Sequence, residues 1–167
     1  SATRPRSESR PMAVQRSSGP APTDWNRYHR GSFPASRLTR HYTQSRVNQV
    51  LCLFAMPESE VVELGGANSC IYDSIVRVLR PRAYHVIDSS SLGLDLLRRR
   101  CSSANLHLHQ EDVRNLRFTS QADIVLSVGL IEHFDAPGTA EVVRVHFSLA
   151  RPGALVLMSF PTPTWLY

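Results

Sequence analysis

Apolar residues along the chain occur in short runs that alternate with longer segments of helical spacing. The short runs are rich in Val, Ile and Leu, as buried parallel strands are, and they predict strands at residues 61–64, 83–87, 106–109, 124–128 and 154–160. The longer segments place apolar residues three to five positions apart, and they predict helices at residues 36–55, 69–80, 91–101 and 138–150. Strands that alternate with helices in this way indicate an α/β protein with a mainly parallel sheet.

Composition divides the chain into three parts. Residues 1–23 are rich in Ser, Pro and Arg and have few large apolar side chains, so we expect a disordered basic arm. Residues 24–57 contain aromatic residues such as Trp25 and Tyr28 followed by the first predicted helix, and we interpret this segment as an N-terminal helical cap. Residues 58–167 contain all five predicted strands and form the main domain.

The basic net charge does not by itself indicate nucleic-acid binding. Residues 1–23 carry +3 of the net charge of +5, so the rest of the chain is nearly balanced. No apolar run is long enough to span a membrane and no secretory signal is recognisable, so we expect a cytoplasmic protein with no membrane partner and no specific nucleic-acid partner. His107 and His109 alternate on a predicted strand, but the sequence offers no third ligand at a suitable spacing, so we expect no metal site.

The candidate binding residues follow the predicted strands, because ligands of open parallel sheets bind outside the carboxyl ends of the strands. These residues are Glu63, Gly65, Gly66 and Ala67 at the first strand, Asp88 and Ser89 after the second, Asp112 and Val113 after the third, and Ser127 and His133 at the fourth. Glycines permit positive φ and a close approach of the backbone to a ligand. An acid in the position of Asp88 can accept hydrogen bonds from both hydroxyls of a ribose.

The order and spacing of these strand ends over residues 61–161 resemble those of class I S-adenosylmethionine-dependent methyltransferases. The first turn of that family reads acid-x-Gly-x-Gly-x-Gly. Glu63 and Gly65 match its acid and first glycine, whereas Ala67 and Ser69 replace the other two glycines. The resemblance implies a Rossmann-like, doubly wound sheet and S-adenosyl-L-methionine as the cofactor.

The resemblance also implies roles for individual residues. Glu63 is expected near the methionine part of the cofactor, while Asp112 takes the adenine amino group and the backbone N–H of Val113 meets the ring. The run Leu-Ile-Glu-His-Phe at residues 130–134 is similar to the branch of the family that acts on small molecules. The expected reaction is therefore methyl transfer to an oxygen, nitrogen or carbon atom of a small-molecule acceptor. His133 is either a general base in that reaction or a structural residue that holds its loop.

A dinucleotide-binding oxidoreductase is the main alternative among Rossmann-like proteins. Its first turn must receive a pyrophosphate, and the carboxylate of Glu63 would repel that group. The fingerprint Gly-x-Gly-x-x-Gly is also absent from the sequence. These two features favour a cationic cofactor without phosphate.

The methyltransferase family usually has seven strands, whereas this sequence predicts five. We therefore expect the domain to be truncated after the fifth strand, which leaves an apolar sheet edge able to pair with a second copy or with another protein. This expectation supports a second hypothesis, in which the chain is a catalytically incomplete cofactor-binding or partner subunit that another chain completes.

Overall fold

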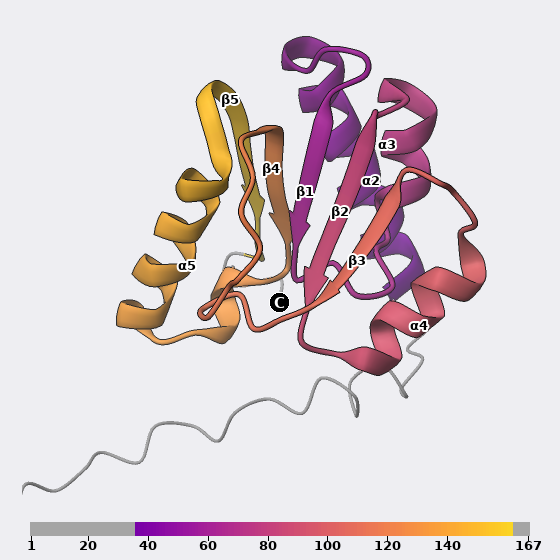
Figure 1. Cartoon of the computed structure of the whole chain (residues 1–167). Coiled ribbons are helices and arrows are strands. Elements are labelled where there is room, and N and C mark those ends of the chain that lie inside the picture. The colour runs from indigo at the N-terminus through magenta and orange to yellow at the C-terminus, as the bar shows by residue number, and fades with distance from the viewer. Residues whose placement is uncertain (1–35, 162–167) are drawn as a thin grey trace, which may run out of the picture.

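The computed structural model describes the backbone of residues 36–161 and the side chains of residues 41–161. The expected disordered arm, Trp25 and Tyr28 of the expected cap, and residues 162–167 lie outside the described residues. Within the described part, five parallel strands form one sheet with helices on both faces (Figure 1). The predicted α/β fold class is confirmed.

The elements follow one another in the predicted order. They are α2 (Ser36–Phe54), β1 (Glu60–Leu64), α3 (Tyr72–Leu79), β2 (Ala83–Asp88), α4 (Ser91–Arg100), β3 (Leu106–Gln110), β4 (Ala122–Val128), the short 3-10 helix η1 (Ile131–His133), α5 (Ala136–Leu149) and β5 (Ala150–Ser159). The order across the sheet is β3-β2-β1-β4-β5, so the strand order reverses between β1 and β4. A ligand of such a sheet binds at this reversal.

Helix α3 begins later than predicted, at Tyr72 instead of residue 69. Asn68 has a positive φ of 49°, which is not helical. The Ser69 hydroxyl accepts hydrogen bonds from the backbone N–H groups of Ile71 (3.2 Å) and Tyr72 (3.0 Å). Ser69 therefore satisfies the free donors at the start of the helix and does not belong to its first turn.

Strand β5 begins earlier than predicted, at Ala150 instead of residue 154. Ala150 pairs with Ala122 of β4, and a register shift then leads to the pair of Ile124 with Leu155. Because α5 ends at Leu149 and β5 begins at the next residue, no loop separates the helix from the strand. Proline and glycine at residues 152 and 153 concealed this strand start in the sequence.

Two apolar clusters fix the sheet between its helical layers. On one face, Leu51 of α2, Ile75 of α3 and Leu97 of α4 pack with Val61 and Tyr84 of the sheet. On the other face, Val142 and Leu149 of α5 pack with Val62, Leu64 and Val125. The strands at the centre are buried on both sides, which holds their carboxyl ends rigidly at one edge.

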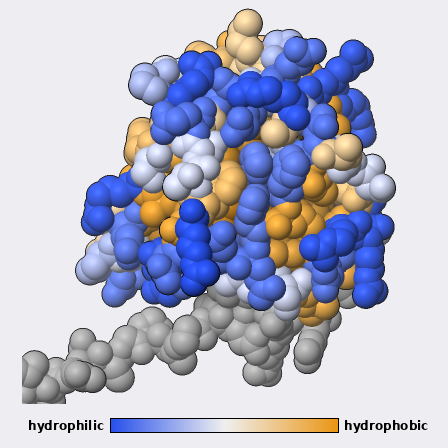
Figure 2. All heavy atoms as spheres, viewed as in Figure 1, coloured by the Kyte–Doolittle hydropathy of each residue, from blue (hydrophilic) through white to orange (hydrophobic). Residues whose placement is uncertain are grey.

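A loop takes the place of a helix between β3 and β4, and it crosses from the end of β3 to the side of β4 that faces β5 (Figure 1). His85 of β2 lies under this loop, with its Nδ1 atom 3.1 Å from Nε2 of His109 and its ring stacked on that of His107. Phe118 of the loop packs on His85 and His109. From the same direction the surface is mostly hydrophilic, with apolar patches between the polar side chains (Figure 2).

Sequence reasoning missed His85 because only the pairing of β2 with β3 brings it beside the other two histidines. Among the described residues, no group of three His, Cys, Asp or Glu side chains could hold a metal ion. None of the described helices is both long and apolar enough to cross a membrane.

Candidate active site

A cavity of about 600 Å³ opens at the carboxyl ends of the strands, where the strand order reverses. Its volume is typical of sites for small organic ligands, which occupy roughly 300–1,000 Å³. Every predicted site residue except Ser127 lines it. The turns after β1, β2, β3 and β4 thus meet around one space, as the rule for parallel sheets predicts.

The turn after β1 needs glycine at two positions. Gly65 has a φ of +68°, and a Cβ atom there would lie 2.7 Å from Cδ1 of Leu130 in the turn after β4. Gly66 lies so close to Glu63 that an added Cβ would meet the carboxyl carbon at 2.6 Å. At both positions the backbone therefore lies too close to a neighbouring side chain for a residue with a Cβ atom to fit.

Glu63 is a buried acid at the floor of the cavity. Only 2% of its surface is exposed, and its Oε2 atom accepts a hydrogen bond of 2.7 Å from the Tyr84 hydroxyl. Burial raises the pKa of Glu63 to about 7, and the nearby charge of Asp88 adds to this, while hydrogen bonds from Tyr84 and Ser69 act in the opposite direction. Glu63 is therefore partly protonated near neutral pH.

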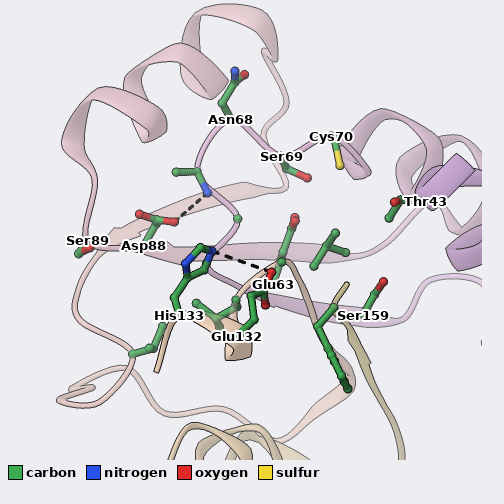
Figure 3. A pocket seen from close by; sticks show the side chains of 18 of the residues that line it. Thr43, Glu63, Asn68, Ser69, Cys70, Asp88, Ser89, Glu132, His133 and Ser159 are labelled. Atoms are coloured by element: carbon green, nitrogen blue, oxygen red, sulfur yellow. Dashed lines mark hydrogen bonds and ion pairs between the residues drawn. The ribbon is translucent and has the colours of Figure 1, made fainter. Parts of the chain in front are cut away.

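Asp88 connects the second strand to the glycine turn. Its Oδ2 atom accepts a hydrogen bond of 3.0 Å from the backbone N–H of Ala67 (Figure 3). Its Oδ1 atom accepts one of 2.7 Å from the backbone N–H of Ser90. These two bonds hold the carboxylate at the end of β2, beside the cavity. The residue thus has the position of an acid that binds a ribose.

The two acids after β3 have different partners. Glu111 accepts a hydrogen bond of 2.6 Å from the backbone N–H of Arg117, so it organises the loop that leads to β4. Asp112 accepts hydrogen bonds from the backbone N–H of Arg114 (2.9 Å) and from its guanidinium (3.0 Å), and Arg114 lowers the pKa of Asp112. The Arg114 guanidinium lies 5.5 Å from the centre of the Phe134 ring. Asp112 is therefore an ionised acid at the cavity wall.

Ser127 lies beneath the cavity and not in its wall. Nδ1 of the buried His146 is 2.8 Å from the carbonyl oxygen of Val142, so Nδ1 carries a proton. Burial lowers the pKa of His146, and in the neutral ring Nε2 then accepts a hydrogen bond of 2.9 Å from the Ser127 hydroxyl. This contact ties β4 to α5, and the next residues, Val128 and Gly129, line the cavity instead.

The sequence matches the family model of a methyltransferase domain over residues 61–153. The chain belongs to this methyltransferase family. The match covers more than half of the chain and includes all four strand-end turns, and the family implies S-adenosylmethionine as the methyl donor. No curated protein sequence matched the chain.

Solved structures share the fold of this methyltransferase domain at low sequence identity. A putative methyltransferase of Haloferax volcanii, solved with the Trm112 methyltransferase activator, has a TM-score of 0.66 at 14% identity, over 80% of this chain and 58% of that one. Magnesium protoporphyrin IX methyltransferase of Synechocystis PCC 6803, solved with S-adenosylmethionine, has a TM-score of 0.62 at 14% identity, over 77% and 66%. Coclaurine N-methyltransferase, bound to N-methylheliamine and S-adenosylhomocysteine, has a TM-score of 0.57 at 15% identity, over 68% and 35%. The chain thus spans between about a third and two thirds of the length of these proteins.

The methyltransferase domain also places a polar pair at the cavity. His133 and Glu132 lie on η1, with His133 Nε2 3.9 Å from Glu132 Oε1. In the close view they face the cavity from the side opposite Asn68, Ser69 and Cys70 (Figure 3). His133 is about one-third exposed, so it can meet a second ligand that enters from solvent.

Two lining residues of the methyltransferase domain gave no signal in the sequence. Arg114 reaches the cavity from the loop after β3, and Thr43 reaches it from α2. Helix α2 is held against the first turn by a hydrogen bond from the Gln44 amide to the carbonyl oxygen of Cys70. Nothing in the local pattern of α2 indicates that it borders the site.

Proposed function

We propose that the chain binds S-adenosylmethionine in this cavity and transfers its methyl group to a small-molecule acceptor. The observation that supports the proposal is the convergence of Glu63, Asp88 and Asp112 from three strands on one cavity. Asp88 accepts hydrogen bonds from the ribose hydroxyls, and Asp112 accepts one from the adenine amino group. The backbone N–H of Val113 meets the adenine ring, and Glu63 faces the cationic methionine part.

The residues of the chain contribute mainly by orienting the two reactants. When bound, the cofactor supplies a sulfonium methyl group with an excellent leaving group, so correct alignment accounts for much of the acceleration. His133 accepts the proton that leaves an acceptor hydroxyl or amine as the new bond to carbon forms. Glu132 lies beside this imidazole, with its Oε1 atom 3.9 Å from His133 Nε2.

A small acceptor agrees with the shape and neighbours of the site. His133, Glu132 and Phe134 line the cavity together, and Phe134 offers an apolar surface beside the polar pair. Two proteins of similar fold are named for small-molecule chemistry, one a magnesium protoporphyrin IX methyltransferase and one bound to N-methylheliamine. The similarity of residues 130–134 to the small-molecule branch of the family favours the same class.

Calorimetric titration with S-adenosylmethionine and S-adenosylhomocysteine tests the proposal. Asp88→Asn removes the charge that accepts the ribose hydroxyls, and a hydrogen bond to a charged group is worth on the order of 10- to 100-fold in affinity. Asp95→Asn is the control, because Asp95 is exposed on α4 and pairs with Arg98. If the wild-type chain binds neither ligand, the proposed function is wrong. A screen of small hydroxyl and amine compounds for S-adenosylhomocysteine release then identifies the acceptor.

A partner-dependent subunit is the second candidate function. One protein of similar fold was solved with a methyltransferase activator. Strand β5 pairs only with β4 among the described residues, so its other edge is open to a strand of another chain. This candidate predicts cofactor binding without turnover in the acceptor screen, and release of S-adenosylhomocysteine by the chain alone excludes it.

A further inference from the structure

The hydroxyl of Tyr84 contacts the floor of the cavity from below, because it hydrogen-bonds to Glu63, which lines the cavity, while Tyr84 itself is buried and does not. Tyr84 is 1% exposed and lies near the start of β2, and its hydroxyl donates to Glu63 Oε2 at 2.7 Å. Its ring is held edge-on against Tyr72 of α3, with 5.0 Å between the ring centres. Nothing in the proposed reaction uses this residue, yet it contacts the one buried acid among the described residues that line the cavity.

We infer that Tyr84 is a positioning residue of the cofactor site, and that its bond to Glu63 sets how cofactor affinity depends on pH. The inference rests on the proposed function, because it requires a cationic ligand in the cavity. Glu63 lies directly beneath Gly66, so the carboxyl group is held between the first turn and the tyrosine. A carboxyl group in this position takes up a proton when the cavity holds no cation and gives it up when a cation binds.

The charged and titratable groups around Glu63 support this coupling. Asp88 at the end of β2 disfavours the ionised form, and Arg100 at the end of α4 favours it. The Ser69 hydroxyl hydrogen-bonds to Glu63, and the Arg100 guanidinium donates to the backbone carbonyl of Ser69 and pairs with Asp73. Arg100 is thus shared with other acceptors and does not neutralise Glu63 alone. A bound cation can therefore still favour the loss of the Glu63 proton.

The pKa of Glu63, raised to about 7, places this proton exchange in the neutral range. A folded protein without cofactor then holds Glu63 about half protonated at pH 7. Cofactor binding releases the remaining proton, so the apparent affinity rises with pH through the neutral range and levels off when Glu63 is fully ionised. The hydrogen bond from Tyr84 stabilises the ionised form and so limits this dependence.

The test compares Tyr84→Phe with the wild type by calorimetric titration of S-adenosylmethionine from pH 6 to pH 9. Loss of one hydrogen bond disfavours the ionised carboxylate by on the order of 10- to 100-fold. With Glu63 half protonated in the wild type, the variant binds roughly 5- to 50-fold more weakly at pH 7, and the difference shrinks as the pH rises toward 9. Titration in two buffers of different ionisation enthalpy measures proton release directly, and the variant releases more.

Tyr72→Phe is the matched control, because it removes a neighbouring tyrosine hydroxyl that hydrogen-bonds to Ser103 and not to Glu63. It retains wild-type affinity at every pH. Glu63→Gln provides a second measurement should Tyr84→Phe fold poorly, since it abolishes proton release on binding.

Three results have distinct meanings. No binding by the wild type refutes the proposed function itself. Binding by the wild type with no proton release, or a loss in Tyr84→Phe that is the same at pH 6 and pH 9, refutes the role of Tyr84 and leaves the proposed function standing.

Discussion

Replacing Gly65 with alanine tests whether close packing of the first turn against Leu130 shapes the cavity. The φ of +68° places an alanine in the left-handed region, at a cost of about 1–2 kcal/mol. The new Cβ would also lie 2.7 Å from Leu130 Cδ1 and 3.3 Å from its Cβ and Cδ2. Leu130 is 6% exposed and cannot simply move into solvent, so overpacking adds about 1–3 kcal/mol.

Gly153→Ala is the matched control for the backbone cost alone. Gly153 has a φ of +80°, and no atom lies within 4 Å of an added Cβ. We therefore expect Gly153→Ala to lower the free energy of unfolding by about 1–2 kcal/mol and Gly65→Ala by about 2–5 kcal/mol. Urea unfolding, followed by tryptophan fluorescence or circular dichroism, measures both values.

A double-mutant cycle identifies the contact responsible. Leu130→Ala removes Cδ1 and Cδ2, two of the three atoms that the new methyl group would meet, including the nearest one, so the double variant is more stable than the sum of the single changes predicts, by about 1–3 kcal/mol. Calorimetric titration shows a loss of S-adenosylmethionine affinity in Gly65→Ala that Gly153→Ala does not share. Equal stability losses at the two glycines, together with strict additivity in the cycle, would refute the reasoning.

Three further changes test separate parts of the structure. Burial and the neighbouring histidines lower the pKa of His85 to about 4, so the folded state binds fewer protons than the unfolded state, and the free energy of unfolding falls by up to about 3 kcal/mol as the pH drops from 6.5 to 4. In urea unfolding over that range, His85→Phe should show a weaker dependence of stability on pH than the wild type. The same pH dependence in both proteins would contradict this prediction. Ser127→Ala leaves buried His146 without its hydroxyl partner and costs about 1–3 kcal/mol of stability, while calorimetry should find cofactor affinity unchanged. His133→Gln should lower kcat roughly 100-fold or more with cofactor affinity intact, measured as S-adenosylhomocysteine release; an unchanged kcat would assign His133 a structural role.

The sequence predicted the strand-end residues well because their positions follow from periodicity and chain topology. Asp88 directly follows a predicted strand, Glu63 is the last residue but one of another, and Asp112 comes three residues after a third; parallel pairing carries all of them to one edge of the sheet. No long-range contact has to be known for that step. The same reasoning placed Ser127 in the site, but it could not determine which face of β4 the side chain occupies beside α5.

Residues whose role depends on register or on loop conformation were not predictable in the same way. Tyr84 reaches Glu63 only because β1 and β2 pair with Glu63 opposite Val86, which places both side chains on one face. Arg114 reaches the cavity because Glu111 binds the backbone of a later part of the loop and turns it back. Each contact joins residues that are distant in sequence, and local patterns carry no information about it.

The first turn keeps its backbone geometry although two of the three glycines of the family motif are replaced. Ala67 replaces a family glycine, and its backbone N–H still donates to Asp88 at 3.0 Å, a contact that requires no glycine. Ser69 replaces another, and its hydroxyl both accepts from the first N–H groups of α3 and hydrogen-bonds to Glu63. The positive φ angles fall on Gly65 and Asn68, where glycine and asparagine tolerate them best. Since the backbone demands are met at other positions, Ala67 leaves the bond to Asp88 in place, and Ser69 adds hydroxyl contacts to the start of α3 and to the buried Glu63.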